Sequence, residues 1–498
     1  MLTRDEILDR LGELMIVGVP GAALDAETEA TLRRIRPAGA ILFTENYVDA
    51  SGAARWTRSL HALLGTPELP ALLSVDEEGG LVSRISHFWE VPPSARAVAS
   101  SGGPALVRDL AARTGRRLLA LGFNLDFAPC LDIDSNSRNP VIGIRSLGEN
   151  PSQVTACGRA AIEGFLSVGV IPVAKHFPGH GDTSLDSHVA IPRVEADERL
   201  LARRELKPFE GAIACGVPMV MTGHILVPAL EPDPNTTATV SHAIVTGLLR
   251  ERMKFGGVVV TDALEMAGAT SLGSYGEVAV RALEAGVDLL LYSKLAPGPE
   301  EALAALRQAV LSGRLSEARV AESLERMRSL RAGSAARAGS WSPELERQAR
   351  DLIPGEELAR ICEGAIRLTK QGAGGIPMKP PIEVLEINRP EGREPIAQLL
   401  RVLGVDAREH EATPSAWPAR VNGSALMTVA ARADLTEEQA ALAQAWLGRF
   451  PETVTVALLN PHVCDDWPAV RTILATFGNS PAARRALARR LLGRVTTS

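Results

Sequence analysis

The chain has 498 residues, of which 46% are hydrophobic and 22% are charged, so it carries enough apolar material for more than one buried core. A net charge of −6 and an aromatic content of 4% argue against a nucleic-acid partner, which would require a basic surface and stacking side chains. Five scattered cysteines without CxxC spacing, no signal-peptide pattern and no apolar run of about 20 residues predict a soluble, cytoplasmic protein without disulfides or membrane contact.

The first 300 residues alternate between short apolar runs and stretches of helical spacing. A capping box of Thr3 and Glu6 opens a short helix ahead of them. The apolar runs show no two-residue alternation, which is typical of parallel strands buried on both faces. They cover residues 14–19, 39–43, 71–75, 123–127, 169–174, 217–222, 257–261 and 287–292. Eight such runs separated by helices predict an α/β fold, a (β/α)8 TIM-like barrel.

A stretch of small residues at 331–340 follows the last helical pattern of the barrel and has little to bury. We therefore predict a barrel over 1–335, a linker over 336–342 and a smaller α/β sandwich-like domain over 343–498. Strand-like runs in this second domain cover residues 382–387, 426–430 and 453–459. Its last helix is expected to begin at Pro481, with Ser480 as the N-cap.

Reactive side chains of such a barrel belong in the loops that follow the carboxyl ends of its strands. The third run is followed by Asp76-Glu77-Glu78-Gly79-Gly80 and by Arg84, and the loop after the fourth run contains Arg145. One interpretation is a sugar site, in which Asp76 accepts hydrogen bonds from hydroxyls and the arginines act as fixed donors. The other is an exposed acidic turn with ordinary surface ion pairs.

The loop over residues 175–188 follows the fifth run and holds three histidines and two aspartates. Three interpretations remain open on these residues alone. The cluster is a metal site, or it is a catalytic loop in which a carboxylate supports a proton-transferring histidine, or it is a polar turn. The spacing of Asp186 and His188 slightly favours acid/base chemistry, because a carboxylate two residues away reaches the imidazole.

Asp262 lies where the seventh apolar run ends. It is a candidate glycosyl-bonding nucleophile or a metal ligand. The alternative is a structural role as a helix N-cap, with Glu265 completing a capping box.

Four motifs together resemble the β-N-acetylglucosaminidases of glycoside hydrolase family 3. They are Ser74-Val-Asp-Glu-Glu-Gly-Gly-Leu-Val-Ser-Arg84, Gly143-Ile-Arg-Ser-Leu-Gly148, Lys175-His-Phe-Pro-Gly-His-Gly-Asp-Thr-Ser-Leu-Asp-Ser-His188 and Val260-Thr-Asp-Ala-Leu-Glu-Met266. The motifs stand in the family's order across about the first 335 residues. In the second domain the resemblance is one of layout only.

The resemblance implies a role for each matching residue. Asp262 matches the family's nucleophile, and His188 matches the histidine acid/base of this subgroup, with Asp186 completing the dyad. Five residues match positions that bind the terminal sugar in this family: Asp76, Arg84, Arg145, Lys175 and His176. The resemblance implies neither a metal nor another cofactor.

The expected activity is therefore retaining hydrolysis of terminal, non-reducing β-linked N-acetylglucosamine, a small carbohydrate, from cell-wall fragments or chito-oligosaccharides. One alternative is a β-N-acetylglucosaminide phosphorylase, because a histidine that is neutral after proton donation does not repel phosphate. Two further alternatives are a metal-dependent hydrolase that uses the cluster from His176 to His188 and a sugar-binding protein without activity. The sequence carries no signal for the oligomeric state.

Overall fold

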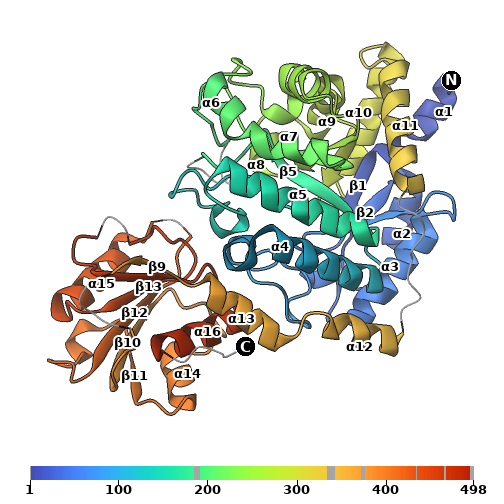
Figure 1. The fold of residues 1–498 in the computed structure, drawn as a ribbon. Coiled ribbons are helices and arrows are strands. Elements are labelled where there is room, and N and C mark those ends of the chain that lie inside the picture. The colour runs from blue at the N-terminus through green and yellow to red at the C-terminus, as the bar shows by residue number, and fades with distance from the viewer. Residues whose placement is uncertain are drawn as a thin grey trace.

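The computed structural model describes residues 2–183, 191–333, 342–371, 376–432, 434–464 and 467–493. Its N-terminal part is a closed barrel in which each parallel strand pairs with the next and β8 pairs with β1 (Figure 1). The strands are β1 Met15–Gly18, β2 Gly39–Ile41, β3 Leu72–Val75, β4 Leu125–Asp126, β5 Ile171–Phe177, β6 Met219–Thr222, β7 Val258–Ala263 and β8 Leu289–Tyr292. All eight lie within or overlap the predicted apolar runs, so the predicted barrel is confirmed.

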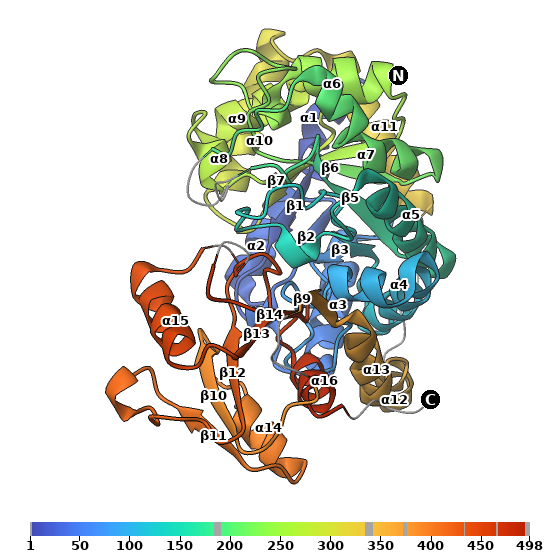
Figure 2. The same cartoon turned by 60° about the vertical axis from the view of Figure 1, so that its left-hand side comes forward.

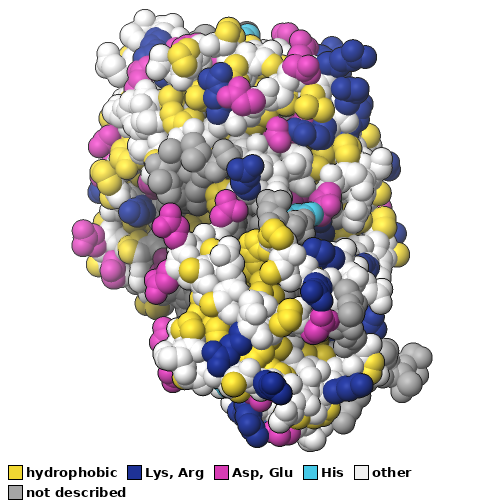
Figure 3. Space-filling view, turned by 90° about the vertical axis from the view of Figure 1, so that its left-hand side faces the viewer, with side chains coloured by type: hydrophobic (Ala, Val, Ile, Leu, Met, Phe, Trp, Pro, Cys, Tyr) yellow, Lys and Arg dark blue, Asp and Glu magenta, His cyan; other side chains and the backbone are white. Residues whose placement is uncertain are grey.

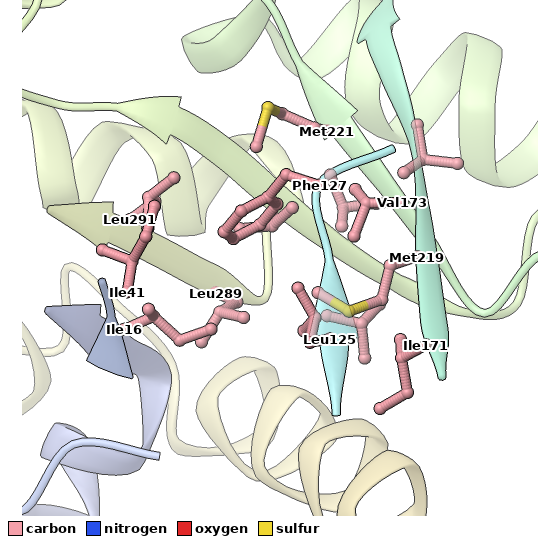
Figure 4. Close-up of a cluster of buried hydrophobic side chains, with 14 of the residues drawn as sticks. Ile16, Ile41, Leu125, Phe127, Ile171, Val173, Met219, Met221, Leu289 and Leu291 are labelled. Atoms are coloured by element: carbon pink, nitrogen blue, oxygen red, sulfur yellow. The ribbon is translucent and has the colours of Figure 1, made fainter. Parts of the chain in front are cut away.

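Apolar side chains from the strands fill the interior of the barrel (Figure 4). Residues two apart on a strand point to the same side, so Ile171 and Val173 of β5 both face inward. The same periodicity brings Lys175 to the inner side at the carboxyl end of β5. The interior is therefore a packed, mainly apolar core, with the charged side chain of Lys175 at its carboxyl end.

Helices surround the barrel. They are α1 Arg4–Asp9, α2 Ala26–Ile35, α3 Ala50–Leu64, α4 Ala95–Ala120, α5 Pro151–Val168, α6 Glu198–Arg203, α7 Leu206–Ala214, α8 Ala267–Thr270, α9 Tyr275–Ala285, α10 Gly298–Ser312 and α11 Glu317–Gly333. A π-helix over Ala243–Arg252 covers the gap between β6 and β7. The predicted capping box of α1 is present, since Thr3 and Glu6 cap each other's backbone N–H groups. Among the described helices, none is long and apolar enough to cross a membrane.

The second domain is a six-stranded sheet with the order β11-β10-β12-β13-β14-β9, in which only β9 is antiparallel to its neighbour. Its strands are β9 Arg367–Lys370, β10 Ile382–Ile387, β11 Ala407–His410, β12 Ser424–Val429, β13 Val454–Ala457 and β14 Thr472–Ala475. Its helices are α12 Pro343–Asp351, α13 Gly355–Ala365, α14 Ile396–Val402, α15 Glu437–Arg449 and α16 Pro481–Leu491. Ser480 caps α16 as predicted. Two cores, one on each face of the sheet, hold this domain together.

The two domains meet along α4 and the loop that follows β4. Helix α13 packs against α4 of the barrel and against α16 of the second domain (Figures 1 and 2). Arg113 of α4 donates two hydrogen bonds, of 2.6 and 2.7 Å, to the carboxylate of Glu357 in α13. Beyond the end of β13, Asn460 donates to the carbonyl of Ser137 at 2.8 Å. The carboxyl edge of the second sheet therefore contacts a loop at the carboxyl end of the barrel.

Residues 336–341 of the predicted linker lie outside the described residues. Its last residue, Ser342, is described and caps α12. The limits of the two domains stay a prediction. On the face shown in Figure 3, acidic, basic and apolar side chains are interspersed.

Candidate active site

A cavity of about 540 Å³ opens at the carboxyl end of the barrel, within the range of small-ligand sites. Side chains that follow six of the barrel strands, β2, β3, β4, β5, β7 and β8, line it together with Arg432 of the second domain. Five predicted site residues, Asp76, Arg84, Arg145, Lys175 and His176, line it with Asp262. The structure therefore brings together every predicted site residue that it describes.

Glu78 is the centre of a buried ionic cluster in the floor of this cavity. Its carboxylate accepts two hydrogen bonds of 2.8 Å from the guanidinium of Arg145, and the ammonium of Lys175 lies 2.7 Å away. Burial alone would raise the pKa of Glu78, but the two cations hold it well below its usual range. Burial alone would lower the pKa of Lys175, but the carboxylates of Glu78 and Asp76 favour its charged form. On balance the pKa of Lys175 is raised. All three groups are therefore charged at neutral pH.

Asp76 stands directly after β3 and faces the cavity. Its two oxygens lie 3.2 Å from the Lys175 ammonium and 3.5 Å from the Arg84 guanidinium. Arg84 also lies over the ring of Phe43, at 5.4 Å from the ring centre. The carboxylate of Asp76 is thus held in place and still has acceptor capacity toward a ligand hydroxyl.

His176 connects a buried carboxylate to Asp262. Its Nδ1 lies 2.7 Å from Oδ2 of Asp132, and its Nε2 lies 4.0 Å from Oδ2 of Asp262. Asp132 also accepts from the backbone N–H groups of His176 and His180. Burial would raise the pKa of Asp132, yet His176 and these contacts keep it well below its usual range. Asp132 is therefore an anion that fixes the orientation of the imidazole.

Asp262 lies on β7 with its side chain partly exposed to the cavity. Burial would raise its pKa, but the neighbouring His176 and His224 and the N–H of Ala263 lower it on balance. The carboxylate is consequently ionised at neutral pH, as a nucleophile must be.

The structure contradicts the helix-cap interpretation of Asp262. The next helix, α8, begins at Ala267 with Met266 at the N-cap position. Glu265 instead accepts from the backbone N–H groups of Ser293 and Lys294 in the loop after β8. The side chain of Asp262 is thus left available to the cavity.

Asp186 and His188 lie outside the described residues, so their predicted roles stay predictions. The loop that leads to them is described up to residue 183. Asp182 forms an ion pair of 2.7 Å with Arg204, and Asn139 donates to the carbonyls of His180 and Gly181. The entry to the loop is therefore anchored to the barrel on two sides.

One metal-ligating combination occurs among the described residues: Cys130, Asp132 and His176, with potential ligand atoms within 4.8 Å of one another. These groups already satisfy each other, because the Cys130 thiol and the His176 ring both contact Asp132. Burial raises the pKa of the Cys130 thiol well above its usual value, so the sulfur is protonated. This donor set is arranged to orient His176, and the wider cluster to His188 extends beyond the described residues.

Comparison with known proteins places this site in a family. The model of the glycosyl hydrolase family 3 N-terminal domain matches residues 6–330. The chain belongs to glycosyl hydrolase family 3.

The relatives of this family 3 chain include β-hexosaminidase A of Pseudoalteromonas piscicida, which is 35% identical over 330 residues, or 62% of this chain and 55% of that protein. The chain thus matches only about half of that relative's length. A β-N-acetylglucosaminidase/β-glucosidase of Cellulomonas fimi is 28% identical to this chain. The match covers 93% of this chain and 87% of the Cellulomonas protein. The solved structure of a family 3 β-N-acetylglucosaminidase from Paenibacillus sp. str. FPU-7 has a TM-score of 0.86 and 32% identity. The match between the two structures covers 100% of this chain and 98% of the Paenibacillus chain.

Sequence reasoning missed two residues of the family 3 site. Glu78 was part of an acidic run, and nothing in that run distinguished the side chain that points inward from its neighbours. Asp132 lies in the loop after the fourth strand and was not singled out as a site residue. Only the structure shows that Cys130, two residues before Asp132, is buried and pairs with Lys175 of β5.

Proposed function

We propose that this family 3 protein is a retaining exo-glycosidase that releases terminal, non-reducing β-linked N-acetylglucosamine. The observation that carries the proposal is the ionised carboxylate of Asp262, which faces the same cavity as the fixed polar side chains of Asp76 and Lys175. The β-N-acetylglucosaminidase names of the Cellulomonas and Paenibacillus relatives support the choice of sugar.

The proposed chemistry proceeds in two displacements. In the first, Oδ2 of Asp262 forms a bond to the anomeric carbon while the bond to the leaving oxygen breaks, and that oxygen takes a proton from His188. In the second, water gives a proton to His188 and attacks the same carbon, and the electron pair of the ester bond returns to Asp262. The first step places the sugar on Asp262, and the second restores both side chains.

The buried cluster binds and orients the sugar in this scheme. Asp76 accepts from sugar hydroxyls, while Lys175, Arg145 and Arg84 are hydrogen-bond donors at fixed positions. His176, held by Asp132, presents its Nε2 beside Asp262. Because the contacts among these side chains exist before a ligand binds, little reorganisation opposes binding.

Cell-wall fragments or chito-oligosaccharides are the natural sources of such a sugar, and we infer that the protein acts on them in the cytoplasm. Four of its five cysteines are buried and all five are free thiols, which suits a reducing compartment.

The test is product analysis on N,N′-diacetylchitobiose by proton NMR, with and without phosphate. The proposal expects free β-N-acetylglucosamine as the first product, unchanged by phosphate. Asp262→Asn should lower kcat on the order of 1,000-fold or more, with unchanged thermal unfolding. First release of the α-anomer, or full activity of Asp262→Asn, would overturn the assignment of Asp262.

His188→Ala tests the proton donor. Substrates with poor leaving groups need protonation and should lose far more activity than activated aryl glycosides, about 100-fold more. An equal loss on both kinds of substrate would contradict the acid/base role.

A further inference from the structure

The second domain contributes Arg432 to the wall of the candidate active site. Arg432 follows β12 at the carboxyl edge of the second sheet and lines the same cavity as Asp262. It also lines a small cavity against the barrel loop over residues 139–144, so it lies at the domain boundary. One domain thus supplies the nucleophile, and the other supplies a cation to the same cavity.

The position of Arg432 in its sheet is one at which parallel α/β sheets commonly bind ligands. After the edge strand β9, the chain forms β10, adds β11 on one side of it, and then crosses to β12 on the other side. The loops after β10 and β12 therefore diverge, and a crevice opens between them at the carboxyl edge. The backbone before Arg432 is well anchored, because Ala430 donates to Ile387 and Ala431 accepts from Asn460.

Among the residues that the structure describes, Arg432 has no ion-pair partner, unlike the cations in the floor of the cavity. Arg145, Lys175 and Arg84 are paired with Glu78 and Asp76. In the described part of the chain, the exposed guanidinium of Arg432 has neither an ion pair nor a hydrogen bond. Lys294, in the loop after β8, is a second exposed side chain of this kind on the barrel side of the cavity.

Arg432 is exposed, whereas Lys175 and Glu78 in the floor of the cavity are buried, so we expect the guanidinium on the side from which the leaving group projects. The terminal sugar must reach Asp262 at the floor, where the paired side chains bind it, so the rest of the substrate points to the exposed rim. Guanidinium groups bind carboxylate and phosphate oxygens in a two-pronged geometry.

We propose that Arg432 binds an oxyanion on the leaving-group side of the cavity and thereby makes the enzyme selective for a charged reaction partner. The inference rests on the proposed glycosidase function. The oxyanion is either a carboxylate of the leaving group or inorganic phosphate as acceptor. In the second case, a phosphate oxygen bonds to the anomeric carbon while the ester bond to Asp262 breaks, and its electron pair returns to the carboxylate. The product is a sugar 1-phosphate.

The carboxylate arm compares two β-N-acetylglucosaminides, one of 4-hydroxybenzoate and one of its methyl ester. The measured quantity is the ratio of kcat/KM for the acid to kcat/KM for the ester. Arg432→Ala should lower this ratio about fivefold relative to the unaltered protein, while Arg432→Lys should retain part of it. The intrinsic difference in leaving-group reactivity cancels, because the same two substrates are used for every variant.

The matched control is Arg420→Ala. Arg420 is an equally exposed arginine of the second domain, but it precedes β12 and lines a groove away from Asp262. This variant should keep the ratio. High salt should reduce the preference of the unaltered protein, since salt screens exposed charges.

The phosphate arm measures the rate of sugar 1-phosphate formation from the ester substrate at increasing phosphate concentration. A rate that rises with phosphate and falls several-fold in Arg432→Ala, but not in Arg420→Ala, identifies phosphate as the oxyanion. An acid-to-ester ratio that depends on Arg432 without sugar phosphate identifies the carboxylate. If Arg432→Ala changes neither quantity while the ester is hydrolysed, the Arg432 proposal is overturned alone. No turnover of either substrate would overturn the glycosidase function and the Arg432 proposal with it.

Discussion

Buried Glu78 explains how a cavity rich in cations keeps a fixed shape. Its carboxylate holds Arg145 and Lys175, and Lys175 in turn contacts Asp76. A buried ion pair contributes little net stability, because desolvation offsets much of the attraction. Its value here is positional, since each donor that reaches the sugar is held before the sugar arrives.

Glu77, next to this cluster, carries a testable pH dependence. Burial raises its pKa to about 7, although Ser83 and the N–H of Arg84 donate to its carboxylate. Between the usual carboxyl range and pH 7 the folded protein therefore binds more protons at this residue than the unfolded chain. Stability from this group is present at low pH and is lost as the pH rises through 7.

We expect Glu77→Gln to remove this dependence. Between pH 5 and pH 8 the unfolding free energy of the unaltered protein should fall by about 1–3 kcal/mol more than that of the variant. Urea unfolding at several pH values measures the difference. Parallel stability profiles would show that Glu77 titrates in its usual range.

The candidate site could be predicted at residue scale where a side chain follows a strand directly, as with Asp76, Lys175 and Asp262. Glu78 and Asp132 could not be assigned roles, because their importance comes from partners distant in the sequence. Glu78 contacts Arg145, which is 67 positions away in the sequence, and Lys175, which is 97 positions away. A local sequence pattern does not predict contacts over such separations.

At the scale of elements, the loop after β5 is constrained by a close backbone contact. A Cβ on Gly181 would lie 1.6 Å from the carbonyl oxygen of Ile133, so any side chain there must displace one of the two loops. Gly181 lies seven residues before His188 in the sequence, so we expect such a displacement to affect the proposed proton donor.

Gly181→Ala should therefore reduce kcat/KM at least tenfold, on the precedent that a misplacement of about 1 Å can cost about 100-fold. Kinetics on an unactivated substrate measure the effect. Gly256→Ala is the matched control, because its Cβ would meet no atom within 4 Å. Equal activity of the two variants would contradict the positional role of the loop.

The elements themselves were predictable to the extent that they are apolar. Every barrel strand is buried along its apolar run and was found from that run, as were β10, β12 and β13. The exposed strand β9 and the polar edge strand β11 were not found, because neither shows an apolar run. The run that forms β14 is buried but was not distinguished from the loops around it.

At the scale of the whole molecule, the carboxyl edge of the second sheet contacts loops at the carboxyl end of the barrel. Arg113 with Glu357 and Asn460 with Ser137 hold this arrangement. His462, in the loop after β13, also contacts Glu149 of the barrel at 3.4 Å.

Arg113→Ala should lower the unfolding free energy by about 1–2 kcal/mol, because a two-pronged, partly buried ion pair is lost. Calorimetry should show the change. If the second domain unfolds in a separate transition, the midpoint temperature of that transition should fall most. Arg347→Ala, which removes an exposed pair within α12, should change stability by less than about 0.5 kcal/mol. Equal effects of both variants would contradict the role of Arg113 in joining the domains.

The loop after β12 has a consequence for how such a protein changes over evolutionary time. Surface loops accept insertions at small cost in stability, since chain-closure entropy grows slowly with length. The loop after β12 belongs to the second domain but borders the active-site cavity of the barrel. It can therefore lengthen or change charge without disturbing the barrel core. New selectivity can then arise by drift in the second domain while the chemistry in the first stays intact.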